Sequence, residues 1–438
     1  MVERAVTFER TLIGPEANGA YGTAVAATKS LLGTKVMPKI MTENKPYGAS
    51  GNRWASGAQQ NREWSEADWE CEVAQYVDGA YLNSMLLGSP NITTPGGGTN
   101  SRELDWFIPS WSAIQPMPFT VWNGSSVRAM KFAYGLMTGL NMTYSRKDGV
   151  AMKGKMIGQK ITDGVTLTPG TNEVQTLAKT GTVSGGTFTL QWRGQTTAPI
   201  AYNASAATIQ TAILLLANLD SGDVVVTGGP AGTSDVIFTF GGQYASLNLP
   251  LIVVNSTSLT GGGSYNITQT TAGAALSELD LTPVSADDWD FYLDTSAAGL
   301  GNTKLTRCFK CSWSIDDLFG PVWVGNTSVE SWAAHVDLTP KTEVKFTVAA
   351  DSTGMGVRTS HLQVDAKAFV RFKCTGPLIE GSLYHLDQRD FAVSITDISE
   401  IGDEDGVAAV EYTGIIAHDS TWGVAANWLM RNELTSIS

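Results

Sequence analysis

The chain has 438 residues, of which 42% are hydrophobic and 16% are charged. This composition is typical of chains that fold around apolar cores, and a chain of this length typically contains two or three domains. The longest apolar stretches, Ala212 to Ala217 and Leu249 to Val254, are far shorter than the roughly 18 residues that a membrane-spanning helix requires. The N-terminal residues have no apolar core of the kind found in a secretory signal. We therefore expect folding in a cytoplasm and no membrane partner.

Net charge is unevenly divided along the chain. Residues 1–169 carry a net charge of +2, residues 170–273 carry −2, and residues 274–438 carry −13. The acidity is concentrated around Glu400, Asp403, Glu404 and Asp405. A surface of this sign repels a phosphate backbone, which argues against tight nucleic-acid binding. Two interpretations stay open: a solvated acidic hairpin tip, or a wall past which DNA moves without being held.

In the first part of the chain, strand-like runs predict a β domain and Gly79 to Leu87 predicts a short helix. A long polar loop through residues 48–51 follows the first of these strands. The strands are expected at Lys35–Met41, Trp69–Val77, Pro118–Trp122, Met130–Tyr144 and Val150–Ile157.

Compositional breaks near residues 168–171 and 270–274 enclose a module that carries almost no charge. Its pattern predicts two strands, a helix and two further strands, and Asn203 or Ser205 could cap the helix through Ala217. The clearest strands are Phe188–Trp192, Val224–Val226 and Val236–Phe240. Such a module can be inserted at a surface loop without disturbing its host.

Beyond the module, the predicted elements follow an order parallel to that of the first part. Strands are expected at Leu305–Ile315, Ala333–Val348, Ala368–Cys374, Phe391–Ile398 and Val407–Ile416. The fold class is therefore mainly β, with residues 1–168 and 274–438 as two tandem β-sandwich domains and residues 169–273 as an inserted small α+β module.

Each of the two parts also contains an Asp-Gly pair between strand-like runs. The first pair is Asp148-Gly149 and the second is Asp405-Gly406. An Asp-Gly pair supplies the positive φ that a tight hairpin turn requires. Recurrence of this pattern within a parallel order of elements predicts a duplicated β domain with a long hairpin in each copy.

The sequence offers little for catalysis or metal binding. Cys308 and Cys311 form a C-x-x-C pair, but Cys71 and Cys374 are isolated and the histidines are scattered, so packing thiols are expected. On a regular strand, the odd spacing would point the two thiols of the pair to opposite faces. Motifs of zinc proteases, serine hydrolases and P-loop enzymes are absent. We expect no enzyme activity, no cofactor and no metal.

Four short segments carry a resemblance to a known family: Gly22–Thr34, Lys155–Gly158, Ser312–Ile315 and Asp405–Ala408. They resemble the major tail tube protein of long-tailed, non-contractile bacteriophages of the siphovirus type, in particular those of actinobacteria. The resemblance spans most of residues 1–168 and 274–438 as a diffuse pattern. The module resembles a separate unit that recurs in phage tail and bacterial surface proteins, through Asn172–Gln175, Gly186–Leu190 and Tyr202–Ala207.

The resemblance implies domains whose long hairpins join across subunits into one closed barrel around a lumen. It implies trimeric, pseudo-hexameric rings in preference to true hexamers, because one chain supplies two domains. Stacked helically, such rings would form a virion tail tube that conducts double-stranded DNA without specific binding. The implied partners are a tape-measure protein, a tail terminator and distal tail proteins. The module would decorate the exterior, where it could contact host surface glycans.

Two residue sets are candidates for contacts in such a tube. The hairpin tips could line the lumen or meet the next ring. The terminal segments Met1–Thr34 and Thr421–Ser438, the latter rich in large apolar residues, could form inter-subunit arms or pack on their own domains. The alternative function is a distal tail, decoration or host-surface-binding protein built from immunoglobulin-like domains. The tip residues are Arg146, Lys147, Asp148, Gly149, Glu400, Asp403, Glu404, Asp405 and Gly406, and the arm residues are Trp422, Trp428, Leu429 and Met430.

Overall fold

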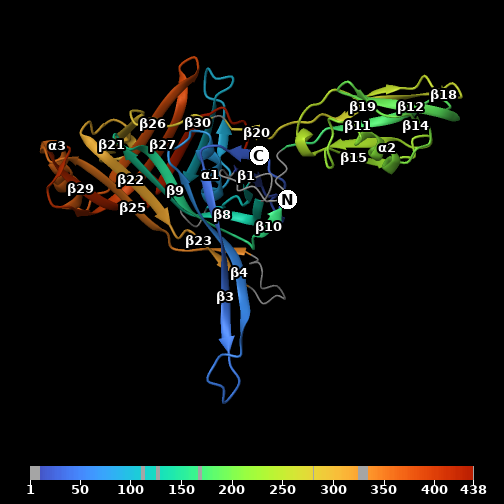
Figure 1. The fold of residues 1–438 in the computed structure, drawn as a ribbon. Coiled ribbons are helices and arrows are strands. Elements are labelled where there is room, and N and C mark those ends of the chain that lie inside the picture. Colours follow the sequence, from blue (N-terminus) through green and yellow to red (C-terminus); the bar gives the residue numbers. More distant parts are fainter. Residues whose placement is uncertain are drawn as a thin grey trace. The chain divides into compact units, whose positions relative to one another are not determined.

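The computed structural model describes residues 10–109, 114–124, 129–165, 170–279, 281–323 and 334–437. The chain forms two compact units (Figure 1). The body comprises Met1–Thr166 and Glu278–Ser438, and the inserted unit comprises Leu167–Ser277. Antiparallel sheets dominate both units, which confirms the prediction of a mainly β protein. No helix in the described ranges is long and apolar enough to cross a membrane.

The inserted unit packs two small sheets and a helix around its own core. Ser205 caps helix α2 by accepting a hydrogen bond from the Thr208 amide, as one of the two predicted caps would. Trp192 packs against Phe240 and Tyr244 at the centre. The elements are β11 (Val174–Thr180), β12 (Gly185–Trp192), β13 (Gln195–Thr196), β14 (Ile200–Ala201), α2 (Ala206–Ile213), β15 (Val224–Gly228), β16 (Val236–Phe240), β17 (Val253–Asn255), β18 (Leu259–Thr260) and β19 (Ser264–Thr271).

The two ends of the inserted unit lie side by side. Thr171 and Ala274 exchange backbone hydrogen bonds of 2.8 and 2.9 Å in an antiparallel bridge. The chain therefore enters and leaves this unit at one place, which is the geometry of an insertion into a loop.

The body contains the remaining elements, divided between two parts of the chain. The first part has β1 (Arg10–Pro15), β2 (Lys29–Leu31), β3 (Lys35–Tyr47), β4 (Gly57–Cys71), α1 (Asp78–Leu87), β5 (Asn91–Thr93), β6 (Arg102–Ile108), β7 (Phe119–Gly124), β8 (Ala129–Ser145), β9 (Gly149–Gly158) and β10 (Thr162–Val165). The second part has β20 (Ser277–Glu278), β21 (Trp289–Asp294), β22 (Cys308–Asp316), β23 (Phe319–Val322), β24 (Ala334–Asp337), β25 (Lys341–Ala349), α3 (Ser352–Val357), β26 (Ala368–Glu380), β27 (Leu383–Ile398), β28 (Gly402–Glu404), β29 (Val407–Ile416) and β30 (Ala426–Asn432).

The two parts of the body repeat one pattern of strand pairing. In the first part the order across the sheet is β3-β4-β9-β8, and in the second it is β22-β25-β29-β27. In each part a helix follows the second strand, α1 after β4 and α3 after β25. The hairpin β7–β8 with its neighbour β1 likewise matches β26–β27 with its neighbour β21. The equivalence therefore covers β1, β3, β4, β7, β8 and β9 of the first part and β21, β22, β25, β26, β27 and β29 of the second.

The two four-strand blocks join through a direct ladder between β8 and β22. Their register runs from Leu140 opposite Ile315 to Ser145 opposite Lys310. The blocks also share one hydrophobic core, which includes Trp69, Trp313 and residues of both helices. The tandem parts therefore form one compact unit with a continuous eight-strand sheet. Their origin by duplication stays a prediction.

Alternation along the strands explains why one face of this sheet is buried. Leu140, Met142 and Tyr144 of β8 point into the core, as do Cys311 and Trp313 of β22. The residues between them are polar and accessible. This period of two is the pattern of a strand with one packed face and one solvated face.

Several predicted strands differ in extent from the structure, among them Ala368–Cys374, which continues to Glu380 as β26, and Phe391–Ile398, which begins at Leu383 as β27. The strand expected at Trp69–Val77 ends at Cys71, because the chain turns there toward α1. The strand expected at Ala333–Val348 divides into β24 and β25, since Pro340 lies between them. The first strand is longer than expected, because β3 continues beyond Met41 to Tyr47.

The two cysteines of the C-x-x-C pair lie on the same face, which corrects the expectation from their spacing. A β-bulge between Cys308 and Lys310 shifts the register, so Cys308 lies opposite Val348 and Cys311 opposite Phe346. Both positions face the core. All four cysteines of the chain lie within the described residues and are free thiols.

The predicted C-terminal arm contains a central strand of its own chain. Strand β30 lies between β27 and β6, and the side chains of Trp428 and Met430 are completely buried. Trp428 packs against Trp313 with ring centroids 5.0 Å apart. The alternative that these side chains pack on their own domain therefore accounts for their position, and removing the segment would remove a core strand. Leu429 is partly buried on the opposite face of β30, and Trp422 packs against Phe369.

A buried ion pair lies beside this tryptophan pair. Arg389 is fully buried, donates to both carboxylate oxygens of Asp387 at 2.6 and 3.1 Å, and lies 4.3 Å from the ring centroid of Trp428. Replacing Arg389 with Met should lower the free energy of unfolding by about 3–5 kcal/mol, because it leaves the Asp387 carboxylate buried without a partner. Denaturant titration measures this loss.

The matched control for this variant removes both charges. The double substitution Asp387→Asn with Arg389→Met should recover most of the lost stability, since no buried charge remains. An Arg389→Met variant as stable as the wild type would contradict this account of the core.

Helix α1 begins with a buried carboxylate that joins two segments. Asp78 Oδ2 accepts hydrogen bonds from the Gly33 amide and the Thr34 hydroxyl at 3.0 and 3.1 Å. Burial raises the pKa of Asp78 to about 6, although these two hydrogen bonds lower it. The folded state therefore keeps a proton that the unfolded state has lost between about pH 4 and pH 6.

This proton binding gives a pH-dependent prediction. The Asp78 contribution to stability falls as pH rises through that window, by up to roughly 3 kcal/mol. An asparagine side chain at this position can accept the same two hydrogen bonds without ionising, so Asp78→Asn should gain stability relative to the wild type between pH 4 and pH 7. Unfolding titrations of both proteins at the two pH values measure this gain. A difference between the proteins that is independent of pH would contradict the raised pKa.

Candidate functional site

The accessible side of the eight-strand sheet is a mostly polar surface, which we call the polar face, and it also exposes Met37 of β3 and Ile415 of β29. Its side chains alternate along each strand with those of the core, and most are small hydroxyl or charged groups. The polar face comprises Lys35 and Lys39 of β3, Glu66, Asp68 and Glu70 of β4, Lys153 and Lys155 of β9, Asn141, Thr143 and Ser145 of β8, Lys310, Ser312, Ser314 and Asp316 of β22, Glu343, Lys345 and Thr347 of β25, Glu411 and Thr413 of β29, and Ser394 and Thr396 of β27.

Charges of opposite sign lie next to one another across this face. One row of directly opposed residues runs Lys35, Glu70, Lys153, Asn141, Ser314 and Glu343. Within it, Lys35 Nζ lies 3.7 Å from the Glu70 carboxylate. Opposed unlike charges stabilise a sheet modestly and leave little net field above it. The face is therefore hydrophilic without being a strong binding surface for either sign of charge.

Burial changes the titration of one carboxylate at the end of this face. Asp316 lies at the end of β22, and its partial burial together with the adjacent Asp317 carboxylate raises its pKa. Lys155 and Lys341 act in the opposite direction. Within the described residues Asp316 belongs to no group of side chains that could hold a metal ion.

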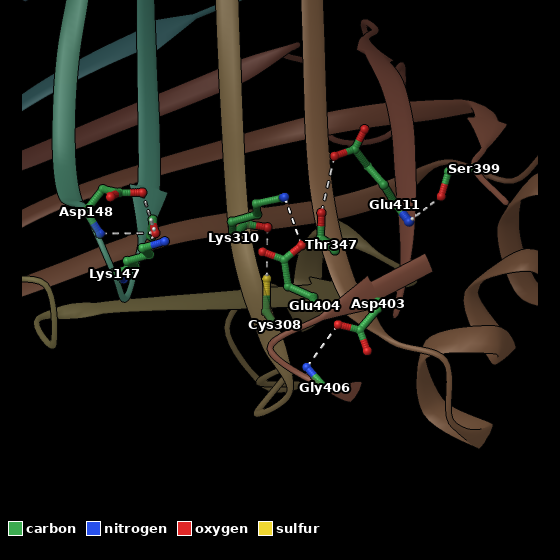
Figure 2. A network of polar contacts seen from close by, with 11 residues as sticks. Lys147, Asp148, Cys308, Lys310, Thr347, Ser399, Asp403, Glu404, Gly406 and Glu411 are labelled. Carbon is green, nitrogen blue, oxygen red and sulfur yellow. Dashed lines mark hydrogen bonds and ion pairs between the residues drawn. The ribbon is translucent and has the colours of Figure 1, made fainter. Parts of the chain in front are cut away.

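The structure brings both Asp-Gly hairpin tips to the same end of the polar face. The β8–β9 tip and the β28–β29 tip flank β22 and β25, and between them lies a cleft of about 590 Å³. Figure 2 shows Lys310 of β22 and Glu404 of β28 pointing toward one another, with Nζ and Oε2 3.0 Å apart. Nearby, Thr347 donates to Glu411 at 3.2 Å, and the Glu411 amide donates to Ser399 (Figure 2).

The two tips are built differently. In the second tip, Asp405 and Gly406 both have positive φ, at 51° and 80°, which is the backbone of a two-residue hairpin turn. In the first tip only Gly149 has positive φ, and the Ser145 hydroxyl accepts hydrogen bonds from the amides of Lys147 and Asp148. The second tip is also extended by β28, which the first lacks.

The structure locates every residue of the predicted tips at this end of the sheet. Arg146 lies 5.8 Å from the ring centroid of Trp289, and Lys147, Asp148 and Asp405 line the cleft. Glu400 and Asp403 are exposed on the approach to the second tip. Whether these residues meet a lumen or another ring stays a prediction. Among the described residues, no group of three or more His, Cys, Asp or Glu side chains could hold a metal ion.

The eight-strand sheet ends in two edges to which the described part of the chain adds no further strand. At one end β3 pairs only with β4, apart from a hydrogen bond from the Asn123 side chain to the Val36 carbonyl at 2.6 Å. At the other end the residues of β27 after Val393 pair only with β29. Open edges present unpaired N–H and C=O groups to any strand that approaches.

A long hairpin that the sequence did not indicate extends one of these edges. Strands β3 and β4 continue together away from the rest of the body (Figure 1). Its exposed apolar side chains include Ile40, Tyr47 and Trp54, and Trp54 at the tip is 81% exposed. The outer half of the hairpin alternates poorly and is polar, so only its inner half carried a strand signal.

The ion pair in the cleft should contribute little to stability. Both side chains of the Lys310–Glu404 pair are partly exposed, and such pairs contribute about 0–1 kcal/mol. Lys310→Met and Glu404→Gln should therefore each change the free energy of unfolding by less than about 1 kcal/mol, as measured by denaturant titration. A loss as large as that expected for Arg389→Met would show that this end of the sheet is needed for folding.

One comparison with known proteins points to a phage tail. No protein-family model matches the chain. The tail sheath protein of Mycobacterium phage Bxz1 is 32% identical over 132 residues, which cover 29% of this chain and 22% of the sheath protein. A solved chain from Mycobacterium phage Patience has 17% identity and a TM-score of 0.17, covering 31% of this chain and 58% of that one. The sequence match supports a structural protein of a phage tail.

Proposed function

We propose that this chain is the major subunit of a phage tail tube, and that three copies form each ring of the tube. The observation that carries the proposal is the ladder between β8 and β22. It joins the end of one four-strand block to the start of the next, and within the described residues the same two kinds of edge are left open at the ends of the eight-strand sheet. Strand β3 is the equivalent of β22, and β27 is the equivalent of β8. A second copy can therefore repeat the joint by placing its β3 beside the end of β27 in the first copy.

Repetition of this joint closes a barrel. Each chain supplies eight strands, so three chains supply twenty-four, and closure leaves no strand edge in the ring. The strand equivalence favours rings of three chains with pseudo-sixfold symmetry over rings of six. Stacking along the axis then forms a tube, because stacked contacts do not close on themselves.

The polar face suits the inner wall of such a barrel. The core side of the sheet is covered by the remainder of the body, so the polar face is the side left to line the lumen. Its mixed charges and hydroxyl groups give DNA no continuous basic surface to bind. This arrangement fits transient passage of double-stranded DNA during delivery of the genome into the host.

The rest of the assembly follows from this role. A tube that does not terminate itself requires partners that set its length and ends, and these would be a tape-measure protein, a tail terminator and distal tail proteins. The subunit would assemble in the cytoplasm of the host bacterium and end in the virion. The inserted unit would decorate the tube exterior, with host surface glycans as a partner.

The alternative is a distal tail, decoration or host-surface-binding protein. Such a protein would not need two unlike open edges that repeat an internal joint, so the edges favour the tube. The relative from Bxz1 is called a tail sheath protein, and the match covers too little of it to assign a sheath role here.

A proline in the open edge of β27 should block assembly without unfolding the subunit. Thr396 lies at a bulge, between Ile395 and Asp397, where it has no partner residue on β29. Proline is tolerated at bulges of edge strands but cannot donate to an added strand. We therefore expect Thr396→Pro to keep the circular dichroism of the wild type and to form no tubes in electron micrographs.

The matched control is Thr396→Ala, which loses the same hydroxyl contact with the Thr413 carbonyl but keeps the amide. This variant should assemble as the wild type does. Normal tubes from Thr396→Pro would contradict the edge joint.

Removing the inserted unit should leave assembly intact. Because Thr171 and Ala274 are adjacent, residues 172–273 can be replaced by a short Gly-Ser linker without separating the flanking chain. Tubes of this variant should form with a smaller outer diameter in electron micrographs. Complete loss of assembly by a folded deletion variant would place the unit within the ring contacts.

A further inference from the structure

The edge formed by β3 exposes lysines. Lys35, Lys39 and Lys45 are all exposed on this strand. Lys35 is 3.7 Å from Glu70, whereas no described residue forms an ion pair with Lys39 or Lys45. The acidic residue of the strand, Glu43, lies 3.6 Å from Arg62. Lys39 lies opposite Glu66 on β4 without forming an ion pair with it, so the edge presents two lysines, Lys39 and Lys45, that pair with no described carboxylate.

The opposite edge exposes carboxylates. Asp397, Glu400 and Asp403 are exposed between the end of β27 and the second hairpin tip. Asp397 accepts a hydrogen bond from the following amide, and Asp403 accepts one from Gly406. No ion pair to any of the three lies within the described ranges, in contrast to Glu404, which binds Lys310.

We propose that the two edges are an electrostatically complementary pair, and that the lysines of β3 in one chain bind the carboxylates of residues 397–403 in a second copy. The inference rests on the proposed function for the identity of the partner. It adds the charge pairing that selects which edges meet.

Strand equivalence indicates where the charges would lie. Lys35 precedes the core residue Val36 as Lys310 precedes the core residue Cys311; Lys35 is the first residue of β3, and Lys310 is the third residue of β22, after the bulge. Lys310 lies opposite Ser145, beside the first hairpin tip. In the proposed joint, Lys35 of one chain therefore lies beside the second hairpin tip of the other chain. Lys39 then lies beside the residues that precede this tip, within 397–403.

Exposed apolar groups accompany the charges on both edges. Ile40 is 53% exposed beside Lys39, and Ile401 is 62% exposed beside Glu400. Burying such groups supplies affinity that surface ion pairs alone do not. The charges then determine orientation and partner.

Charge pairing of this kind explains why a ring would form instead of a symmetric dimer. Two β3 edges brought together would oppose lysines, and two β27 edges would oppose carboxylates. Like charges disfavour both twofold pairings, so only the head-to-tail contact between unlike edges remains favourable. This contact is the kind that closes into a ring.

Charge reversal and charge exchange test the proposal on the full chain. Lys39→Glu and Glu400→Lys should each raise the protein concentration needed for tube formation by about tenfold or more, because each places like charges across every joint. The double variant, Lys39→Glu with Glu400→Lys, should return to near the wild-type concentration. Turbidity and electron microscopy across a protein dilution series measure all three variants.

A control variant separates the effect of the joint on assembly from the effect of net charge. Lys179→Glu in the inserted unit makes the same change in net charge as Lys39→Glu and should leave assembly unchanged. Wild-type tubes together with normal assembly of both single variants, or a double variant no better than either single one, would overturn the charge pairing but leave the proposed tube intact. Wild-type chains that stay monomeric at every concentration would overturn both.

Discussion

A strand at the end of a sheet leaves backbone N–H and C=O groups without partners, and the body of this protein is organised around that constraint. Between the two blocks this constraint is satisfied where β8 of the first block pairs with β22 of the second. Within the described residues, β3 and the end of β27 keep one edge without a partner strand. These two edges are equivalent to the two strands that meet inside the chain, and the proposed joint between chains repeats that internal pairing.

The packing of the body holds these two edges in a fixed position relative to one another. A single core beneath the eight strands includes residues from both parts of the chain, so the two blocks cannot move as separate domains without exposing it. The buried Arg389–Asp387 pair and its tryptophan neighbours lie in this core, at strands that come from the second part, while β6 of the first part pairs with β30. A rigid body of this kind holds its two open edges at a fixed angle, which closing a ring requires.

Local sequence patterns predicted much of the secondary structure. Alternating apolar residues located β8, β9 and β29 to within a residue or two, and the run Gly79 to Leu87 located α1. The Ser205 cap and the limits of the inserted unit followed from short-range signals of the same kind. Each of these features depends on residues that are neighbours in the sequence, and such features can be predicted from periodicity and turn chemistry.

Features that depend on distant residues escaped prediction. The sequence left open whether Trp428 and Met430 belong to an arm or pack on their own domain, because nothing local shows that β27 and β6 lie on both sides of their strand. The β-bulge between Cys308 and Lys310 turns the Cys308 side chain toward the core, which the spacing of the two cysteines did not indicate. The pairing of β8 with β22 joins residues that lie far apart in the chain. The hairpin tips were recognised, but their meeting at one end of the polar face arises from the order of strands in the folded sheet.

The number of chains per ring tests the central claim most directly. Tubes assembled from the purified chain can be imaged by electron cryomicroscopy and reconstructed helically. The account predicts three chains per ring, with β3 of one chain paired to the end of β27 in the next and the polar face toward the lumen. Six chains per ring, or rings in which β3 and β27 remain unpaired, would contradict it.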